Sequence, residues 1–254
     1  MSTSDLKDKL NKKMQTERTV VDMPETGLAT LDSEYIALQS NAMEIISENL
    51  KNRPLSRQSI DMIKSPGGGS VVFTVPSIAG DEILKELTGV ILDYATPRAY
   101  WDSADPVEGT PPTCYSLDSV VSHDGKPCNR CVHNEFGSKG GGETNAKACK
   151  EFVELYMLRP GNIMPIIVRV PVSSKLMFDR YLTRLVSTTI PLCGVITKIT
   201  LEKATSKGGK PYAKYNFEAI NTLSPVETSN LRAFSRKVME SLSSVENQEL
   251  REVI

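Results

Sequence analysis

The segment GVITKITLEK (residues 194–203), followed by ATSKGGKP and then YAKYNFEAI (residues 212–220), decides the fold. Both long segments alternate apolar and polar side chains with a period of two residues, which is typical of a β-strand with one buried face. The connection between them is short, basic and glycine-containing, as a hairpin turn requires. We therefore predict a long antiparallel β-hairpin in which Tyr215 and Phe217 face the core.

Shorter β-type segments precede the hairpin, and only one helix is expected among the later strands. The strand-like segments are VVFTVPS (71–77), GVILDY (89–94), PRAYW (97–101), residues 151–158 and residues 163–172. The helix is expected over residues 174–187, with an apolar side made of Leu176, Met177, Tyr181, Leu182 and Leu185. The strand–helix alternation of a doubly wound parallel sheet is missing. The pattern favours a mainly β (α+β) fold, an OB-like Greek-key barrel with flanking helices.

Composition divides the 254 residues into three parts. Residues 1–65 are expected to form a polar N-terminal arm with a helix over residues 30–52, and residues 223–254 a C-terminal helix and tail. Residues 66–222 are expected to form the barrel domain. No segment approaches the roughly 18 consecutive apolar residues of a membrane span, and the first residues lack the apolar run of a secretory signal. A cytoplasmic location without membrane partners is expected.

Residues 114–149 are rich in glycine, lysine and asparagine and contain few apolar residues, so this segment cannot bury a core of its own. It holds four of the five cysteines: Cys114, Cys128, Cys131 and Cys149. Because structural disulfides are rare in the cytosol, the spacing C-x₁₃-C-x₂-C-x₁₇-C favours a structural Zn²⁺ site in an insertion of the barrel. His123 or His133 could replace one cysteine, and unrelated free thiols or a redox or catalytic cysteine are the alternatives. Cys193 is interpreted as an ordinary buried thiol.

Charge is segregated along the chain although the net charge is only −1. Residues 159–214 contain ten basic and two acidic side chains. Such a local excess is the usual footprint of a surface that binds a polyanion, and solvated lysines on an exposed sheet are the alternative.

Single-stranded nucleic acid is bound by cations that contact phosphates and by aromatic rings that stack on bases. On the hairpin the candidates are Lys198, Lys203, Lys207, Lys210, Tyr212 and Lys214. Elsewhere the candidates are Arg98, Tyr100, Trp101, Lys139, Lys147, Lys150 and Arg169. The alternative for the aromatic residues is a role in packing. The glycine-rich segment 137–142 fits either a phosphate clamp or a plain linker.

The order of several motifs resembles a family of phage and mobile-element single-stranded DNA-binding proteins. These motifs are GVILDYATPRAYW, TPPTCYSLD, DGKPCNRC, FGSKGGGETNAKACKE, YMLRPGNIMPIIVRVPVSS and the hairpin, within about residues 88–222. The resemblance implies an OB-like DNA-binding barrel with a four-cysteine zinc insertion, in which Cys114, Cys128, Cys131 and Cys149 are the ligands. The C-terminal VENQELREVI departs from the acidic tail with an aromatic tip that single-strand binders often have.

We therefore expect a non-enzymatic single-stranded DNA-binding protein that acts in phage DNA replication or recombination, in the host cytoplasm and beside other replication or recombination proteins. A zinc-containing transcriptional or virion interaction protein is one alternative. A nucleic-acid-processing enzyme is another, but a deaminase needs H-x-E before P-C-x-x-C, and here His133-Asn134-Glu135 follows it. A metal nuclease would have to use the carboxylates Asp102, Asp105 and Glu108.

Overall fold

The expected hairpin is present as the antiparallel strands β9 (Val195–Thr205) and β10 (Pro211–Thr222). The computed structural model describes residues 42–51, 53, 56–103, 110–140, 145–206 and 208–252. Ile199 and Tyr215 are fully buried on the core side of the hairpin, so the predicted alternation is confirmed.

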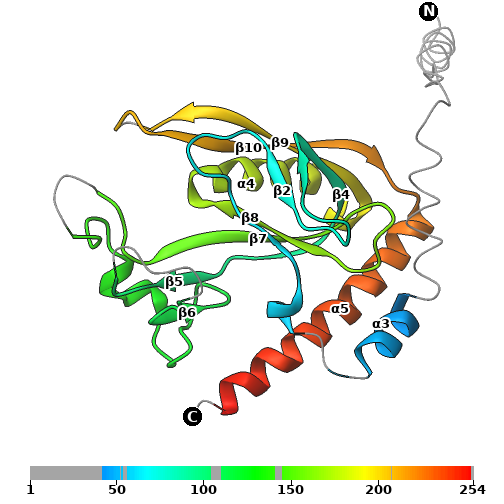
Figure 1. Cartoon of the computed structure of the whole chain (residues 1–254), viewed down its shortest axis with the longest axis horizontal. Helices are drawn as coiled ribbons and strands as arrows, with labels where there is room; N and C mark the ends of the chain where they lie inside the picture. Colours follow the sequence, from blue (N-terminus) through cyan, green and yellow to red (C-terminus); the bar gives the residue numbers. More distant parts are fainter. Residues whose placement is uncertain are drawn as a thin grey trace, which may run out of the picture.

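The strand β4 (Glu86–Ala95) is the centre of the main sheet. Its first half pairs with β9 and its second half pairs with β7 (Lys150–Leu158), both antiparallel. The strand β8 (Ile166–Pro171) follows β7, and the two-residue strand β1 (Met62–Ile63) lies parallel to β8. The order β1-β8-β7-β4-β9-β10 makes a sheet that curls into a half-barrel (Figure 1).

Gly89 lies where β4 changes its partner from β9 to β7. A Cβ atom at this position would lie 2.4 Å from the carbonyl oxygen of Leu158 and 2.9 Å from Cγ of Met157. Two non-bonded atoms do not approach so closely, so the crossing of β4 over β7 requires a residue without a side chain.

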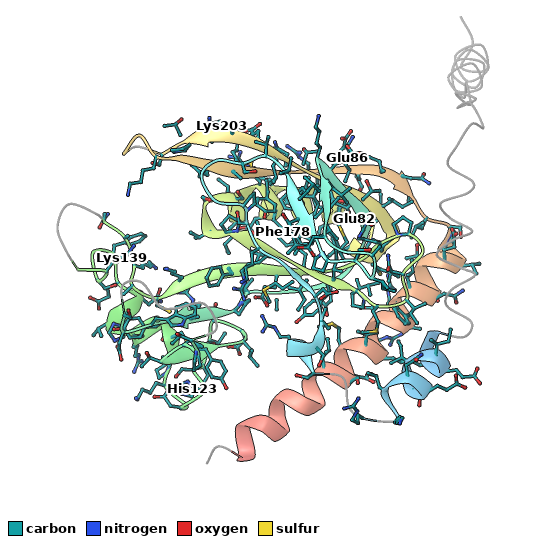
Figure 2. All side chains as sticks on the ribbon, in the orientation of Figure 1. Glu82, Glu86, His123, Lys139, Phe178 and Lys203 are labelled. Atoms are coloured by element: carbon teal, nitrogen blue, oxygen red, sulfur yellow. The ribbon has the colours of Figure 1, made fainter. Side chains whose placement is uncertain are left out.

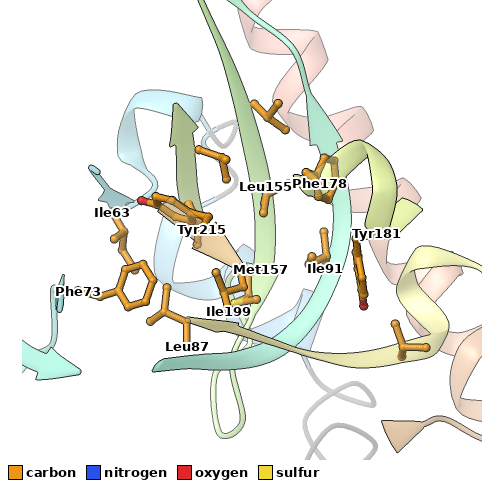
Figure 3. Close-up of a cluster of buried hydrophobic side chains, with 14 of the residues drawn as sticks. Ile63, Phe73, Leu87, Ile91, Leu155, Met157, Phe178, Tyr181, Ile199 and Tyr215 are labelled. Atoms are coloured by element: carbon orange, nitrogen blue, oxygen red, sulfur yellow. The ribbon is translucent and has the colours of Figure 1, made fainter. Parts of the chain in front are cut away.

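Two helices pack on opposite faces of the curled sheet (Figure 1). The helix α4 (Val172–Ser187) packs against β10, β7 and β8 and joins the cluster of buried side chains drawn in Figure 3. The helix α5 (Pro225–Glu252) packs against β4 and belongs to a second cluster. Each face of the sheet therefore has its own hydrophobic core. The α4 core side chains are Phe178, Tyr181 and Leu185, and those of α5 are Leu231, Phe234, Val238 and Leu242.

The segment between β4 and β7 forms a separate protrusion at one end of the sheet, which we call the cysteine lobe (described residues 96–103, 110–140 and 145–149) (Figure 1). Its elements are β5 (Arg98–Tyr100), β6 (Cys114–Ser116), η2 (Cys128–Arg130) and η3 (Val132–Asn134). The strand β5 pairs with β6 and also with the start of β7, and this second pairing attaches the lobe to the sheet.

The remaining elements are short. They are α3 (Ala42–Leu50), η1 (Arg57–Ser59), β2 (Phe73–Val75), β3 (Glu82–Leu84) and η4 (Leu192–Gly194). The strands β2 and β3 form a hairpin, and Phe73 and Val75 are fully buried in the α4 core. Of the helix expected over residues 30–52, only α3 falls within the described residues; residues 1–41 lie outside them.

The mainly β, α+β fold with flanking helices agrees with expectation, but one face assignment was wrong. Leu176, expected on the apolar side of α4, is 54% exposed, and Phe178 is buried in its place. The helix begins at Val172, and its buried stripe runs through residues 174, 178, 181 and 185. Among the described residues, no helix is long and apolar enough to cross a membrane.

Candidate functional site

The four clustered cysteines line one cavity of about 590 Å³ inside the cysteine lobe. Cys114 begins β6, Cys128 begins η2, Cys131 follows η2, and Cys149 directly precedes β7. Cys128 is buried and the other three are partly exposed. Cysteines that are as much as 35 residues apart in sequence therefore converge on one space. Cys193 is buried at η4 in the body of the sheet, as expected of an ordinary thiol.

Backbone hydrogen bonds hold the cysteine-bearing loops against one another. The amide of Cys128 donates to the carbonyl oxygen of Val120 at 2.9 Å, and the amide of Cys149 donates to that of His133 at 2.8 Å. The side-chain amide of Asn134 donates to the carbonyl oxygen of Cys128 at 2.9 Å. The Cys128–Cys131 turn is thus tied both to the β6 side of the cavity and to the strand that follows Cys149.

The cysteine lobe has almost no hydrophobic core. Among the described residues of the segment 114–149, only Ser116, Ser122 and Cys128 are buried. Four apolar side chains of this segment are exposed, Val120, Val121, Val132 and Phe136, and Leu117 is only partly buried. The four cysteines line one cavity in a segment without a core, as a structural Zn²⁺ site would require. Among the described residues, however, no three of their sulfur atoms all lie within 4.8 Å of one another, so the structure does not show a closed four-cysteine site.

At two of the four cysteines, Cys114 and Cys149, the surroundings favour the protonated thiol. Burial raises the pKa of the Cys114 thiol, and Asp124 and the neighbouring cysteines raise it further. Burial also raises the pKa of Cys149, although the nearby Arg98 guanidinium opposes this effect. A bound divalent cation would reverse this balance, because coordination deprotonates a thiol.

A second group near the cavity also offers metal-ligand atoms. The ligand atoms of Cys114, His123 and Asp124 all lie within 4.8 Å of one another, and His123 and Asp124 are exposed. The Nδ1 atom of His123 already accepts a hydrogen bond from the amide of Tyr115 at 3.4 Å. His133 lines the cysteine cavity and stacks on Tyr100 with ring centroids 3.8 Å apart.

A second cavity, of about 340 Å³, lies where the cysteine lobe meets β7 and β8, and we call it the groove. Its lining combines arginine, aromatic, proline and small polar side chains with one carboxylate. The lining residues are Ser56, Arg57, Pro97, Arg98, Ala99, Trp101, Pro111, Pro112, Tyr115, Ser116, Leu117, Phe152, Glu154 and Arg169. Glu154 is fully buried and pairs with both Arg57 and Arg169, the latter at 2.7 Å. The guanidinium of Arg169 also covers the ring of Phe152, at 4.8 Å from its centroid.

The groove brings together three of the residues predicted to contact nucleic acid: Arg98, Trp101 and Arg169. Lys150 is adjacent, with its ammonium 6.0 Å from the centroid of the Trp101 ring. The remaining candidates of the lobe are separate from the groove lining: Tyr100 lines the cysteine cavity, Lys147 donates to Asn134 at 3.0 Å, and Lys139 is exposed at another part of the lobe (Figure 2).

The hairpin face that was predicted to be basic is neutralised by cross-strand ion pairs. Lys198 pairs with Glu218 and Lys214 pairs with Glu202, each at 2.7 Å. In agreement, Glu218 raises the pKa of Lys198, and Lys214 lowers the pKa of Glu202. The two-residue alternation puts these glutamates on the same strand face as the lysines, but the pairs themselves depend on the strand register.

The other hairpin candidates lie toward the turn. Tyr212 is half-buried, whereas Lys203 and Lys210 are exposed, and Lys203 is labelled in Figure 2. Lys207 lies outside the described residues, as do the carboxylates Asp105 and Glu108. Of the nine basic side chains of residues 159–214 that the structure describes, five are in ion pairs: Arg159, Arg169, Lys175, Lys198 and Lys214.

Sequence reasoning missed Arg57, Phe152 and Glu154, which form much of the groove. One signal was present, because Glu154 interrupts the apolar strand segment FVELYML. A carboxylate on a buried strand needs a cationic partner, but this requirement does not tell which residue supplies it. No family model, no curated protein and no solved structure matches the chain.

Proposed function

We propose that this protein binds single-stranded DNA without transforming it, through an OB-like barrel whose insertion is held by a structural Zn²⁺ ion. Such an activity suits DNA replication or recombination, in which single strands are exposed. The observation that supports it best is the strand order β8-β7-β4-β9-β10, with α4 between β8 and β9 in the chain.

That order is the one expected of an OB-type barrel. There, the first of five strands pairs with the second and the fourth, and a helix connects the third to the fourth. Here β4, β7, β8, β9 and β10 would be the five strands in chain order, and α4 the connecting helix. The hydrogen bond from the Tyr215 hydroxyl to the carbonyl oxygen of Arg169, 3.2 Å, links the last of these strands to the third.

The position of the groove agrees with this proposal. OB folds bind oligonucleotides on the face of the second and third strands, between the loop that joins strands one and two and the loop that joins strands four and five. These strands correspond to β7 and β8, and the loops to the cysteine lobe and the β9–β10 turn. The groove lies between the lobe and that face, and it contains arginine and aromatic side chains.

The metal has a supporting role in this proposal. Cys114, Cys128, Cys131 and Cys149 would hold the ion, and four thiolates leave it no open position for catalysis. The ion would supply the stability that the lobe cannot obtain from buried apolar side chains. A fixed lobe in turn keeps Arg98 and Trp101 beside β7, where the groove needs them.

Fluorescence anisotropy with labelled oligonucleotides tests the proposal. The complete chain is titrated with oligo-dT and with a duplex of equal length, in the same buffer. We expect the single strand to bind at least about tenfold more tightly, a difference of about 1.4 kcal/mol. Equal or tighter binding of the duplex would favour a transcriptional role, and the absence of binding to either DNA would refute the proposal.

A further inference from the structure

We infer that residues 67–70, which we call the glycine loop, and the exposed side chains of Lys203 and Lys210 form one binding site for the phosphate backbone of single-stranded DNA. This inference rests on the proposed function. It extends the DNA-binding surface to a segment outside the five strands of the barrel, and it makes the β9–β10 turn one side of the site.

The glycine loop precedes β2 in the chain and lies against the end of the β9–β10 hairpin (Figure 1). A Cβ atom at Gly69 would lie 2.9 Å from Cβ of Pro211 and 3.5 Å from Cε of Lys203. Gly69 is buried and has a φ of 73°, a conformation that residues with side chains rarely adopt. The lack of a side chain at Gly69 therefore lets two segments that are distant in sequence meet at one surface.

Two lysines without carboxylate partners give this surface its positive charge. Residues 62–80 and 203–217 contain five lysines and no aspartate or glutamate. Lys203 and Lys210 are exposed and, within the described part of the chain, have no ion-pair partner. The carboxylate that precedes Lys203 in sequence, that of Glu202, already forms a cross-strand ion pair at 2.7 Å. Surface cations of this kind attract the phosphates of a nucleic acid.

The glycine loop offers main-chain donors and an open approach to them. Among the described residues, the amides of Gly67 and Gly68 have no hydrogen-bond partner. Both residues are exposed, and a Cβ atom at either position would meet no atom of a non-adjacent residue within 4 Å. The amide of Ser70 closes the turn by donating to the carbonyl oxygen of Gly67 at 3.1 Å. Amides of an exposed turn beside ammonium groups are donors with which proteins bind phosphate.

Both ends of the glycine loop are anchored in the core. Ile63 of β1, before the loop, is buried beside β8, and Phe73 of β2, after the loop, is fully buried. The ring of Phe73 contacts that of Tyr215 on β10, with centroids 5.8 Å apart. Because these contacts fix the loop next to β10 before DNA binds, little conformational entropy is lost on binding.

The shape of the site favours a long polyanion over a small anion. Lys203 and Lys210 lie toward an exposed turn and line neither of the two cavities described above. A small anion is bound tightly when a concave site encloses it, whereas a nucleic acid gains affinity from many phosphate contacts spread along a surface. The β9–β10 turn and the glycine loop therefore suit a DNA backbone.

Amide hydrogen exchange of the native protein tests the site without any substitution. Exchange is followed by mass spectrometry with and without saturating oligo-dT, and the β2–β3 turn (residues 76–81) is the reference segment. We expect oligo-dT to slow the exchange of residues 64–72 and of the β9–β10 turn, and to leave the reference segment unchanged. Bound oligo-dT that leaves residues 64–72 unprotected would overturn the inference and keep the proposed function intact. No binding of oligo-dT would instead refute the proposed function.

Inorganic phosphate distinguishes a DNA site from a site for a free anion. At the same total phosphate concentration as the oligo-dT, it should leave the exchange of residues 64–72 unchanged, because one small anion gains none of the neighbouring contacts of a strand. Equal protection by inorganic phosphate and by oligo-dT would overturn the assignment to DNA.

A charge placed on the glycine loop tests the site through affinity. Gly67 is exposed, does not have a positive φ and has open space around it, so Gly67→Glu should fold normally. We expect this variant to bind oligo-dT at least about threefold more weakly, because a carboxylate about 6 Å from a phosphate repels it even in water. Ala79→Glu adds the same charge to the exposed β2–β3 turn and is the matched control, with unchanged affinity expected.

Coupling between the glycine loop and the lysines is the sharpest comparison. In a chain that also carries Lys203→Ala and Lys210→Ala, Gly67→Glu should cost less affinity than it does alone, because the loop and the lysines contact the same stretch of backbone. Circular dichroism melting checks that each variant is folded. A Gly67→Glu variant that binds like the native protein, or losses that simply add, would overturn the inference.

Discussion

Arg98 donates a hydrogen bond from Nη1 to the side-chain oxygen of Asn134, and this contact joins the two cavities of the molecule. Asn134 is also bonded to the carbonyl oxygen of Cys128, while Arg98 pairs with Glu151 on β7 at 2.6 Å. A shift of Asn134 in the cysteine cavity would therefore move the side chain of Arg98, which lines the groove. Loss of order around the cysteines should disturb the groove as well.

Zinc content is the most direct prediction. Protein purified without added metal should contain about one zinc per chain by elemental analysis, because four cysteines line one cavity. Cys128→Ser combined with Cys131→Ser should abolish zinc binding and make the lobe sensitive to protease. Cys193→Ala is the matched control, since Cys193 is remote from the cavity, and it should keep the metal. Native protein with less than a few tenths of an equivalent of zinc would contradict the proposed site.

The hairpin lysines should fall into two classes. Lys203 and Lys210 are exposed near the turn, whereas Lys198 and Lys214 are held by glutamates. Lys203→Ala combined with Lys210→Ala should flatten the salt slope of oligo-dT binding by about 1.4, two phosphate contacts at about 0.7 each. Lys198→Ala combined with Lys214→Ala removes the same charge and should change the slope much less. Equal effects of the two double variants would show that the ion pairs open when DNA binds.

The core of α4 provides a stability test with a control on the same helix. Phe178 is fully buried and contacts the rings of Tyr94 and Phe217, whereas Leu176 is 54% exposed. Phe178→Ala should lower the free energy of unfolding by about 3–5 kcal/mol. Leu176→Ala should change it by less than about 0.5 kcal/mol. Urea unfolding of both variants measures the difference, and similar values would contradict the assigned face of the helix.

Stability at high pH should depend on Tyr215. Burial raises the pKa of this phenol from 10.0 to about 12. The folded chain therefore binds the phenolic proton more tightly than the unfolded chain does. The contribution of Tyr215 to the free energy of unfolding is fully present below pH 10 and is lost as the pH rises toward 12. Compared with Tyr215→Phe, the native protein should lose about 2–3 kcal/mol more over this interval. Parallel pH dependences of the two proteins would show that Tyr215 ionises as freely as in the unfolded chain.

Much of the sheet could be predicted from the sequence, because most of its strands alternate or are continuously apolar. The strands β4, β7, β8, β9 and β10 were each expected within a few residues of their observed bounds. The short strands β3 and β6 were missed, since three residues are too few to show a period. The face of α4 was misjudged because apolar residues occur on more than one side of it, and only packing decides which are buried.

The candidate site was less predictable, because its geometry depends on pairs distant in sequence. Grouping the four cysteines needed only their spacing and the lack of apolar residues around them. The pairing of Arg57 with Glu154, by contrast, spans 97 residues. The sequence around either residue does not predict its partner. The cross-strand lysine–glutamate pairs depend on the hairpin register, which a count of charges along the chain does not include.

The short strand β1 has a consequence for how the molecule behaves among its own copies. Its two residues lie along β8 and cover backbone groups that would otherwise face solvent at the end of the sheet. An uncovered strand is a template on which another chain can add by hydrogen bonding. A shortened chain that begins at Pro66 would lose this cover and should self-associate as its concentration rises. Met62 and Ile63 thus help to keep neighbouring molecules apart.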